Sequence, residues 1–328
     1  MEYRALGKTG YNVSALSMGG LFVSKLGAER ENANRTIHRA LELGINYIDT
    51  APGYLDSEEV LGIALHDVTQ PYILSTKLGG RPQPFDPQDK TVLRRSVVES
   101  LRLLGRDTID ILMIHEPDRP GQFDWFPDWD HFHGPVTELL AELKSEGVIR
   151  FTGLGGTTPY ELAHIIKTGE YDVVLTAFNY SLLWQEALIE VIPAAKNLGM
   201  GIVIGSPLQQ GALAQVYTDQ VEKGARWLSS PRREQFKRLY ALVHDLDIPI
   251  TELALRFVIS NLDISTVLMG AKSVDEVEQN VRSVEAGPLP PDVLKEIQEI
   301  ASTVPYRPFE EPFSLPFKRD YKGPGDAR

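Results

Sequence analysis

The sequence predicts an α/β fold, a single eight-stranded (β/α)8 barrel, and three observations support this. Short runs of β-branched and apolar residues alternate with longer segments of helical periodicity along most of the 328 residues. Eight such strand–helix pairs can be counted, the number with which a parallel sheet closes on itself. A doubly wound open sheet is the competing architecture, but no G-x-G-x-x-G fingerprint follows the first strand.

Each predicted element follows from its local pattern. Gly44, Gly105 and Gly147 stand where three helices should end, and Asp56 or Ser57 can cap the second helix. The strands are expected at Ser14–Ser17, Asn46–Asp49, Tyr72–Thr76, Ile109–Ile114, Ile149–Gly153, Val173–Ala177, Gly201–Ile204 and Ile264–Leu268. The helices are expected at Asn34–Leu43, Ser57–Leu65, Thr91–Leu104, Pro135–Ser145, Pro159–Lys167, Glu186–Asn197, Ile250–Ser260 and Val274–Val284.

Four segments lie outside this alternation. Residues 3–13 predict a hairpin that closes the bottom of the barrel, and 116–134 and 205–231 predict long loops, which in compact domains are usually functional or disordered. The tail is rich in Pro and Phe and is expected to drape over the surface. We therefore expect one domain over residues 1–328, with a barrel core from about 14 to 303 and a tail from 304 to 328.

Composition excludes several classes of function. The hydrophobic fraction of 42% is sufficient for a packed core, and the net charge of −12 argues against nucleic acid or an anionic membrane as partner. Without cysteine, the chain can form no disulfide framework and has no thiolate nucleophile. Because a signal-peptide layout and a long apolar stretch are both missing, we expect a cytoplasmic protein.

Four reactive side chains stand at or just after predicted strand ends: Asp49, Tyr54, Lys77 and His115. Because successive parallel strands end on one rim of a barrel, these groups can meet in one site. An ammonium beside a phenol favours phenolate and lowers the pKa of the phenol, while a carboxylate keeps the ammonium charged. Each residue alone is more often structural than catalytic, but together they are typical of proton-coupled hydride transfer to a carbonyl.

The motifs around these residues resemble those of the aldo-keto reductase family over nearly the whole chain. The resemblance implies a TIM barrel, nicotinamide-dependent carbonyl reduction or its reverse, and Tyr54 as general acid in a tetrad with Asp49, Lys77 and His115. The segment Ala177–Leu183 is also similar to the aldose dehydrogenase branch. The matching motifs are Leu6–Ser14, Ile48–Tyr54, Ser75–Lys77, Ile109–His115, Leu143–Phe151, Ser206–Leu208 with Gly211, and Gly270–Ser273 with Asn280.

The same resemblance implies a cofactor site along the rim. Lys272 suits the 2′-phosphate of NADP(H), whereas Glu276 would repel it, so NADP(H) is favoured slightly and NAD(H) is the alternative. The chain departs from many relatives at Gly153–Gly156, where two side chains that hold the carboxamide are missing, and at Gly205, where a stacking ring is missing. The implied contacts are Gly19, Gly20 and Asp49 at the nicotinamide ribose, Asn179 at the carboxamide, Ser206, Pro207, Leu208 and Gly211 at the pyrophosphate, and Gly270, Lys272, Gln279 and Asn280 toward adenosine.

The predicted substrate is a small carbonyl compound or sugar. Glu116 follows the histidine where many relatives have Trp, and a polar pocket wall favours a hydroxylated substrate. Tyr54 and His115 would contact the carbonyl, and Trp125 and Trp129 could stack on a sugar face, or they could simply anchor their own loop.

Two further clusters have plain interpretations. We expect no metal, because Asp124, Asp128, Asp130, His131 and His133 most simply form an acidic solvated loop. The cations Arg232, Arg233, Lys237 and Arg238 are expected to form a solvated helix face. The alternative function is a cofactor-sensing regulatory subunit, which a complete tetrad disfavours but does not exclude.

Overall fold

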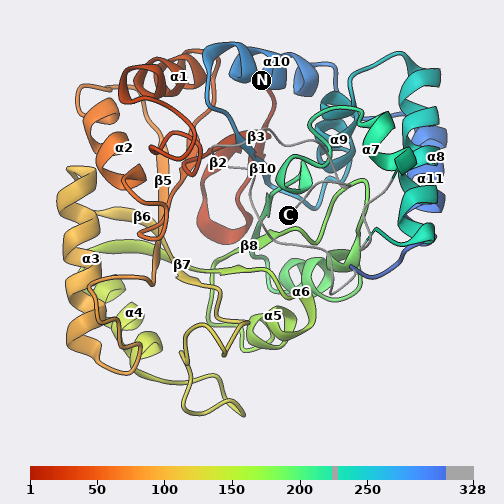
Figure 1. The fold of residues 1–328 in the computed structure, drawn as a ribbon. Helices are drawn as coiled ribbons and strands as arrows, with labels where there is room; N and C mark the ends of the chain where they lie inside the picture. Colours follow the sequence, from red (N-terminus) through yellow and green to blue (C-terminus); the bar gives the residue numbers. More distant parts are fainter. Residues whose placement is uncertain (224–227, 308–328) are drawn as a thin grey trace.

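The computed structural model describes residues 1–223 and 228–307, and its main sheet is a closed barrel of eight parallel strands (Figure 1). Strand β10 pairs with β3 on one side and with β9 on the other, which closes the ring and confirms the predicted fold. The strands are β3 Leu16–Gly19, β4 Tyr47–Asp49, β5 Ile73–Leu78, β6 Ile109–His115, β7 Ile149–Gly156, β8 Val173–Ala177, β9 Gly201–Gly205 and β10 Thr266–Gly270.

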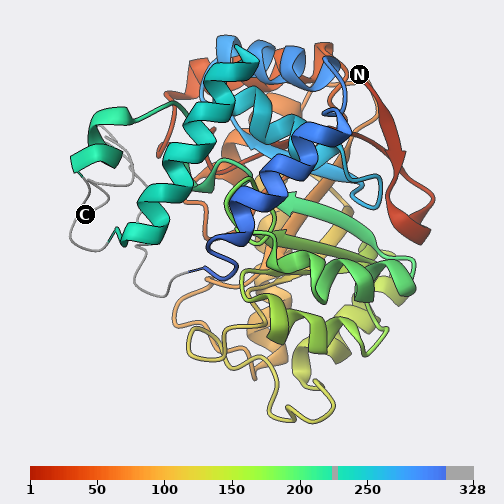
Figure 2. The ribbon, with the colours of Figure 1, turned by 90° about the vertical axis from the view of Figure 1, so that its right-hand side faces the viewer.

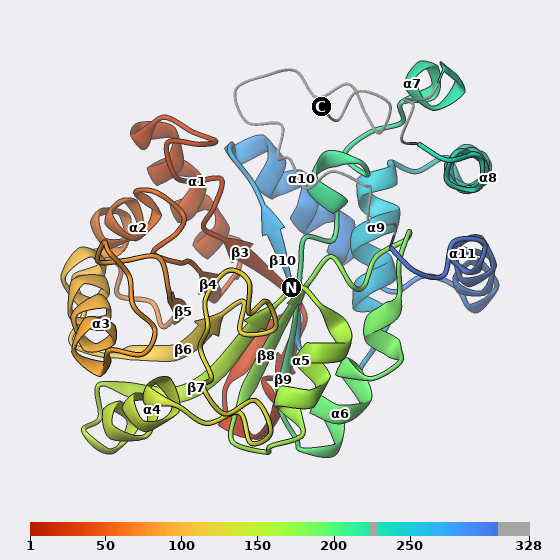
Figure 3. The same cartoon turned by 60° about the horizontal axis from the view of Figure 1, so that its bottom comes forward.

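Helices follow the strands and surround the barrel (Figure 3). Asp89 caps α3 through the backbone N–H groups of Thr91 and Val92, and Gly105 ends that helix in the left-handed conformation. Asp56 occupies the N-cap position of α2, but its side chain makes no capping bond and accepts from the Lys25 backbone N–H instead, while Ser57 Oγ donates to the Gly20 carbonyl oxygen. These helices are α1 Arg30–Glu42, α2 Ser57–Leu65, α3 Lys90–Leu104, α4 Pro135–Ser145, α5 Pro159–Ile166, α6 Val191–Asn197, α9 Ile250–Ile259 and α10 Val274–Glu285.

The structure departs from the predicted elements at several places. Helix α1 begins four residues earlier than predicted, and β7 ends three residues later. The helix expected over 186–197 is divided into the 3-10 turn η2 (Glu186–Leu188) and α6, because the Pro193 ring cannot follow a helical turn at its i−4 position. Strands β3 and β10 each begin two residues later than predicted. Three helices lie outside the eight predicted strand–helix pairs, and α8 contacts the other two: α7 Thr218–Lys223, α8 Ser230–Leu246 and α11 Pro291–Ser302 (Figures 2 and 3).

The N-terminal hairpin closes the barrel bottom, as predicted. Strands β1 (Tyr3–Ala5) and β2 (Asn12–Ser14) are antiparallel, with the 3-10 turn η1 (Gly7–Thr9) between them. Leu6 and Val13 are fully buried in one cluster with inward-facing barrel residues such as Tyr47 and Val203. This apolar packing leaves the opposite rim, where the strands end, for chemistry.

The predicted tail, 304–328, lies outside the described residues except for its first four, so its expected course is not tested. Among the residues that are described, none of the helices is long and apolar enough to span a membrane.

Candidate active site

The structure brings the four predicted catalytic residues together at the rim. Asp49 ends β4, Lys77 lies in β5 and His115 ends β6, while Tyr54 lies in the turn before α2. Lys77 Nζ is 2.6 Å from Asp49 Oδ2, and each of these side chains is only 2% exposed. The Tyr54 ring centroid is 5.0 Å from Lys77 Nζ and 6.0 Å from the His115 ring centroid, with the two rings edge to face. An acid, an amine, a phenol and an imidazole therefore form one contiguous group.

Hydrogen bonds with two further groups, the Ser75 hydroxyl and the Thr50 carbonyl, hold this cluster in place. Ser75 Oγ donates to Asp49 Oδ1 at 2.6 Å, so both carboxylate oxygens are engaged. Lys77 Nζ also donates to the Thr50 carbonyl oxygen at 2.8 Å. The sequence analysis did not select Ser75, although its position two residues before Lys77 on β5 places both side chains on the same face of the sheet.

Electrostatics assign different roles to the three titratable groups near the carbonyl position. Burial lowers the pKa of Lys77, but the Asp49 charge and the Tyr54 phenol outweigh it, so the pKa is raised and the amine stays charged. Burial raises the pKa of Tyr54 and Lys77 opposes this rise; the net direction is upward, contrary to the lowering we expected. Burial, with a contribution from Lys77, lowers the pKa of His115 to about 3. At neutral pH the phenol is protonated and the imidazole is neutral.

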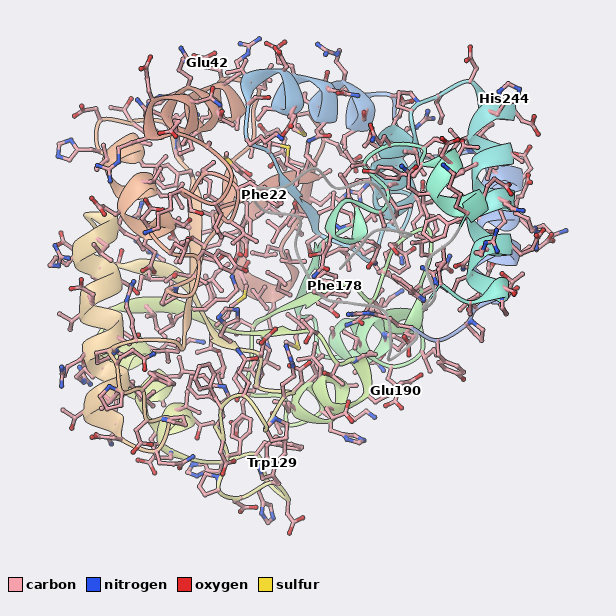
Figure 4. All side chains as sticks on the ribbon, in the orientation of Figure 1. Phe22, Glu42, Trp129, Phe178, Glu190 and His244 are labelled. Atoms are coloured by element: carbon pink, nitrogen blue, oxygen red, sulfur yellow. The ribbon has the colours of Figure 1, made fainter. Side chains whose placement is uncertain are left out.

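Glycines at the strand ends let the backbone and side chains beside this cluster pack closely. The Gly20 backbone N–H donates to the Asp49 carbonyl oxygen at 2.6 Å, and a Cβ at Gly20 would lie 2.7 Å from Ser57 Oγ. Gly19 and Gly270 pair in register across β3 and β10. The ring of Phe22 lies against Gly270, where an added Cβ would meet it at 2.5 Å. Phe22 was not predicted; Figure 4 shows it near the middle of the molecule, together with Phe178.

The segment predicted to hold the pyrophosphate has an unusual backbone. Ser206, Gln209 and Gln210 have φ values of 53°, 48° and 56°, and Gly211 has 100°. Three consecutive residues, Gln209 to Gly211, therefore have positive φ, which turns the chain sharply after β9. Pro207 and Leu208 lie inside this turn, directly after β9.

The remaining predicted cofactor contacts differ in their exposure and in the partners they already have. Lys272 is exposed, with Nζ 4.0 Å from Glu276 Oε1, and Glu276 Oε2 accepts from the Lys272 backbone N–H. Gln279 is exposed, whereas Asn280 is buried with Nδ2 3.5 Å from Met269 Sδ. Asn179 is buried, and its Nδ2 donates to Thr176 Oγ1 at 2.9 Å.

Two predicted substrate contacts do not face the site. Trp125 is fully buried and donates from Nε1 to the His115 carbonyl oxygen at 3.1 Å, so it has no face free for a sugar. Trp129 packs edge to face on Phe126 and Phe132, and Figure 4 shows it at the lower edge of the molecule. Both tryptophans anchor their own loop, which corrects the stacking interpretation. Glu116 does adjoin the tetrad and is 17% exposed, paired with Arg119 at 3.1 Å.

Other charged clusters have no catalytic geometry. His131 Nδ1 is 2.8 Å from Asp128 Oδ2, and within residues 1–223 and 228–307 no three His, Cys, Asp or Glu side chains are placed to hold a metal ion. Arg232 is only 1% exposed and lies over the Trp184 and Phe236 rings, so a solvated face is wrong for this residue.

A cavity of about 710 Å³ lies between α3 and the segment after β5, away from the tetrad. Arg81, Lys90, Arg94 and Arg95 line it, and the first three each pair with a glutamate.

Comparison with known proteins decides the family. The sequence profile described as "Aldo/keto reductase family" matches residues 15–302. The chain belongs to the aldo/keto reductase family. It is 32% identical to L-galactose dehydrogenase of Arabidopsis thaliana, over 93% of this chain and 95% of that one. It is 27% identical to a putative voltage-gated potassium channel subunit beta of Schizosaccharomyces pombe, over 93% and 94% of the two chains.

A solved structure supports the same assignment. The holo form of an aldo-keto reductase from Bacillus halodurans superposes with a TM-score of 0.75 at 30% identity, covering 95% of this chain and all of that one. The protein is thus an oxidoreductase of the aldo/keto reductase family, built on its TIM barrel.

The rim has open space next to the tetrad, which is compatible with the nicotinamide cofactor that this family uses. At Gly80 an added Cβ would approach only Gly53, at 3.9 Å, and at Gly53 it would approach only His115, at 3.8 Å. The space next to Tyr54 and His115 is thus bounded by backbone, which lets flat groups approach closely.

Proposed function

We propose that the protein is an NAD(P)(H)-dependent oxidoreductase that interconverts the carbonyl and alcohol forms of a polyhydroxylated substrate, with Tyr54 as general acid and base. The observation that supports this most is the chain of contacts from Ser75 through Asp49 and Lys77 to the Tyr54 ring. When bound, the nicotinamide supplies or accepts the hydride. Side chains of this protein supply the proton and orient the carbonyl group.

Tyr54 is the proton donor in this proposal. A carbonyl oxygen that gains alkoxide character needs both stabilisation and a proton. Tyr54 is protonated at neutral pH, and the Lys77 charge opposes the rise that burial imposes on its pKa. As the phenol loses its proton to the alkoxide, the nearby ammonium stabilises the phenolate. Asp49 keeps that ammonium charged and in place.

His115 orients the carbonyl oxygen rather than protonating it. With a pKa lowered to about 3, its imidazole is neutral at physiological pH and holds one N–H as a hydrogen-bond donor. It stands edge to face against Tyr54, so the two donors can converge on one oxygen. A neutral imidazole at this position is a poor acid but an adequate donor.

Glu116 supports the proposal of a hydroxylated substrate. Its carboxylate and the Arg119 guanidinium form an ion pair directly after His115, so the rim beside the carbonyl position is polar. Such groups discriminate strongly in favour of substrate hydroxyls. Similarity to a protein named L-galactose dehydrogenase agrees with a sugar or related polyol.

NADP(H) is the proposed first cofactor, because exposed Lys272 supplies a cation beyond the end of β10. Its partner Glu276 reduces that advantage, so NAD(H) is the alternative. Ratios of kcat/KM for NADPH and NADH, and for NADP⁺ and NAD⁺, test the choice. A ratio clearly below one would assign NAD(H).

Turnover of a substrate panel tests the whole proposal. Aldoses, hydroxylated ketones and apolar aromatic aldehydes are each supplied with both cofactors, and the nicotinamide absorbance is followed in both directions. We expect the aldoses or hydroxylated ketones to react with the largest kcat/KM. Activity on apolar aromatic aldehydes alone would overturn the substrate class.

A second function, a cofactor-sensing subunit, is favoured by the similarity to a protein named as a channel subunit. It predicts that NADPH or NADH binds, as seen by calorimetry, while no member of the panel is turned over. Turnover at ordinary enzymatic rates would rule out a role limited to sensing.

A further inference from the structure

Asp118 is a buried carboxylate that links the segment after His115 to the next strand–helix unit. It lies three residues after His115 and is 2% exposed. Its Oδ2 accepts hydrogen bonds from the backbone N–H groups of Thr157, at 2.7 Å, and Thr158. Thr158 is the N-cap residue of α5, and its own side chain makes no capping bond. The carboxylate of another loop therefore holds the two residues that lead into α5 and places a negative group at its N-terminus.

The glycine at the end of β7, Gly156, leaves room for the Asp118 carboxylate. A Cβ at Gly156 would lie 2.7 Å from Asp118 Oδ2 and 2.9 Å from its Cγ. This is the motif Gly153–Gly156 in which the chain departs from many relatives. The loss of a side chain at position 156 and the presence of the Asp118 carboxylate are thus two parts of one arrangement.

The segment held by this link is strained. Glu116 has φ 50°, a left-handed conformation that costs a non-glycine residue about 1–3 kcal/mol unless its surroundings enforce it. Its backbone N–H donates to the Gly155 carbonyl oxygen at 2.6 Å, and His115 pairs in register with Gly155. The chain therefore turns sharply just after His115. Backbone hydrogen bonding of Glu116 and the side-chain bonds of Asp118 both fix this turn.

We propose that Asp118 is a positioning residue of the active site: by bonding Thr157 and Thr158 it holds the turn at Glu116, which aims His115 at Tyr54 and places the Glu116 carboxylate on the rim. Asp118 itself touches neither substrate nor cofactor. The inference rests on the role proposed for His115.

The surroundings of the Asp118 carboxyl make the link sensitive to pH. Oδ1 of Asp118 is buried and has no hydrogen-bond partner, so the carboxyl is held in a place where its charge is poorly solvated. Burial raises the pKa of Asp118 to about 6; the Glu116 charge assists this rise, and backbone hydrogen bonds, chiefly from Thr158 and Thr157, oppose it. The charged groups facing it are Glu116 and, through that residue, Arg119; β7 and α5 present Gly156 and Leu162, which are uncharged.

Protonation of Asp118 therefore weakens the link as the pH falls through about 6. The other two groups do not titrate there, because the pKa of His115 is about 3 and that of Tyr54 is raised above its ordinary value of 10. An inflection of kcat near pH 6 can then be assigned by substitution.

The test compares Asp118→Asn with Asp118→Ala. An asparagine can place its oxygen on the two N–H donors and its NH2 at the Oδ1 position, so D118N should keep kcat at pH 8 within about twofold and lose the inflection near pH 6. D118A removes the link, and kcat should fall about tenfold to a hundredfold at every pH, as for a small misplacement of catalytic groups. Thr158→Ala, which leaves the backbone N–H intact, is the matched control.

A second measurement does not depend on turnover. In protein with isotope-labelled histidine, the His115 ring signals should shift with an apparent pKa of about 6 in the native protein and not in D118N, although the ring itself stays neutral. If the native enzyme shows no turnover, this arm still decides the inference, so its failure is distinguishable from failure of the proposed function. Two outcomes would overturn the inference. One is that the His115 ring signals of the unsubstituted protein do not change between pH 5 and 8. The other is that a folded D118A protein keeps the kcat and the ring signals of the unsubstituted protein.

Discussion

Two tyrosine–aspartate arrangements stand at opposite ends of this barrel. At the bottom, Tyr11 donates its phenol directly to Asp110 Oδ1 at 3.1 Å. At the rim, Tyr54 is separated from Asp49 by Lys77, whose Nζ is 2.6 Å from the carboxylate. Cations are present at both ends, but at the bottom Arg106 and Arg150 pair with Asp110, whereas at the rim Lys77 lies between the phenol and the carboxylate.

That order decides what each phenol can do. Burial and the adjacent Asp110 charge raise the pKa of Tyr11 to about 12, so its proton is held between two oxygens. For Tyr54 burial also raises the pKa, but the ammonium opposes the rise and stabilises the phenolate that forms. With an amine between phenol and carboxylate, the phenol can therefore act as an acid, whereas a phenol bonded directly to a carboxylate only makes a structural hydrogen bond.

The largest expected effect comes from removing each phenol in turn. Tyr54→Phe removes the proton donor and should lower kcat by about 10²–10⁴-fold, with little change in cofactor affinity. Tyr11→Phe is the matched control: kcat should stay within about twofold, and the free energy of unfolding should fall by about 1 kcal/mol for one lost hydrogen bond. Steady-state kinetics and denaturant unfolding measure both. An unchanged kcat in Y54F would exclude Tyr54 as the acid.

The next largest effect is expected on the free energy of unfolding, when the Lys77 amine is removed. Lys77→Met leaves the Asp49 carboxylate buried without its charged partner and should cost about 3–5 kcal/mol of unfolding free energy. The double variant Asp49→Asn, Lys77→Met removes both charges and should unfold at a higher denaturant concentration than K77M alone. Lys144→Met breaks the half-exposed pair with Asp172 and should cost less than about 1 kcal/mol. A double variant no more stable than K77M would contradict this account of the pair.

A smaller effect is expected in the pH dependence of stability. His115 has a pKa of about 3 in the folded protein, below its ordinary value of 6.5, so between these values the unfolded chain binds the extra proton. Unfolding is therefore favoured increasingly as the pH falls from about 6.5 toward 3. The difference in unfolding free energy between native protein and His115→Gln should move in favour of the variant from pH 7 to pH 5. A difference independent of pH would show that the imidazole is not buried neutral.

The smallest effect is expected for an exposed pair at the rim, where solvent screens charge. Glu276→Gln removes the carboxylate beside Lys272 and should raise the preference for NADPH over NADH by about two- to fivefold. Lys272→Met should shift the preference the other way. The ratio of kcat/KM for the two cofactors measures both, and an unchanged ratio in both variants would move the 2′-phosphate contact elsewhere.

Much of the candidate site could be predicted because strand periodicity is local. Parallel strands end on one rim, so Asp49, Lys77 and His115 could be grouped from sequence alone. The same period-two pattern could have identified Ser75. Trp125 could not be assigned, because a tryptophan in a loop can face solvent or core, and only packing against Phe85 and Phe123 decides.

The sequence by itself determined the alternation of elements, helices such as Ser57–Leu65 and Pro135–Ser145, and the chemistry available at the rim. These follow from periodicity and turn residues that act within a few positions of the chain. Only the tertiary structure decided the burial of Arg232, the link from Asp118 to α5, and the net direction of the Tyr54 pKa. Each of these depends on desolvation and on charges brought together from distant segments, which no local pattern records.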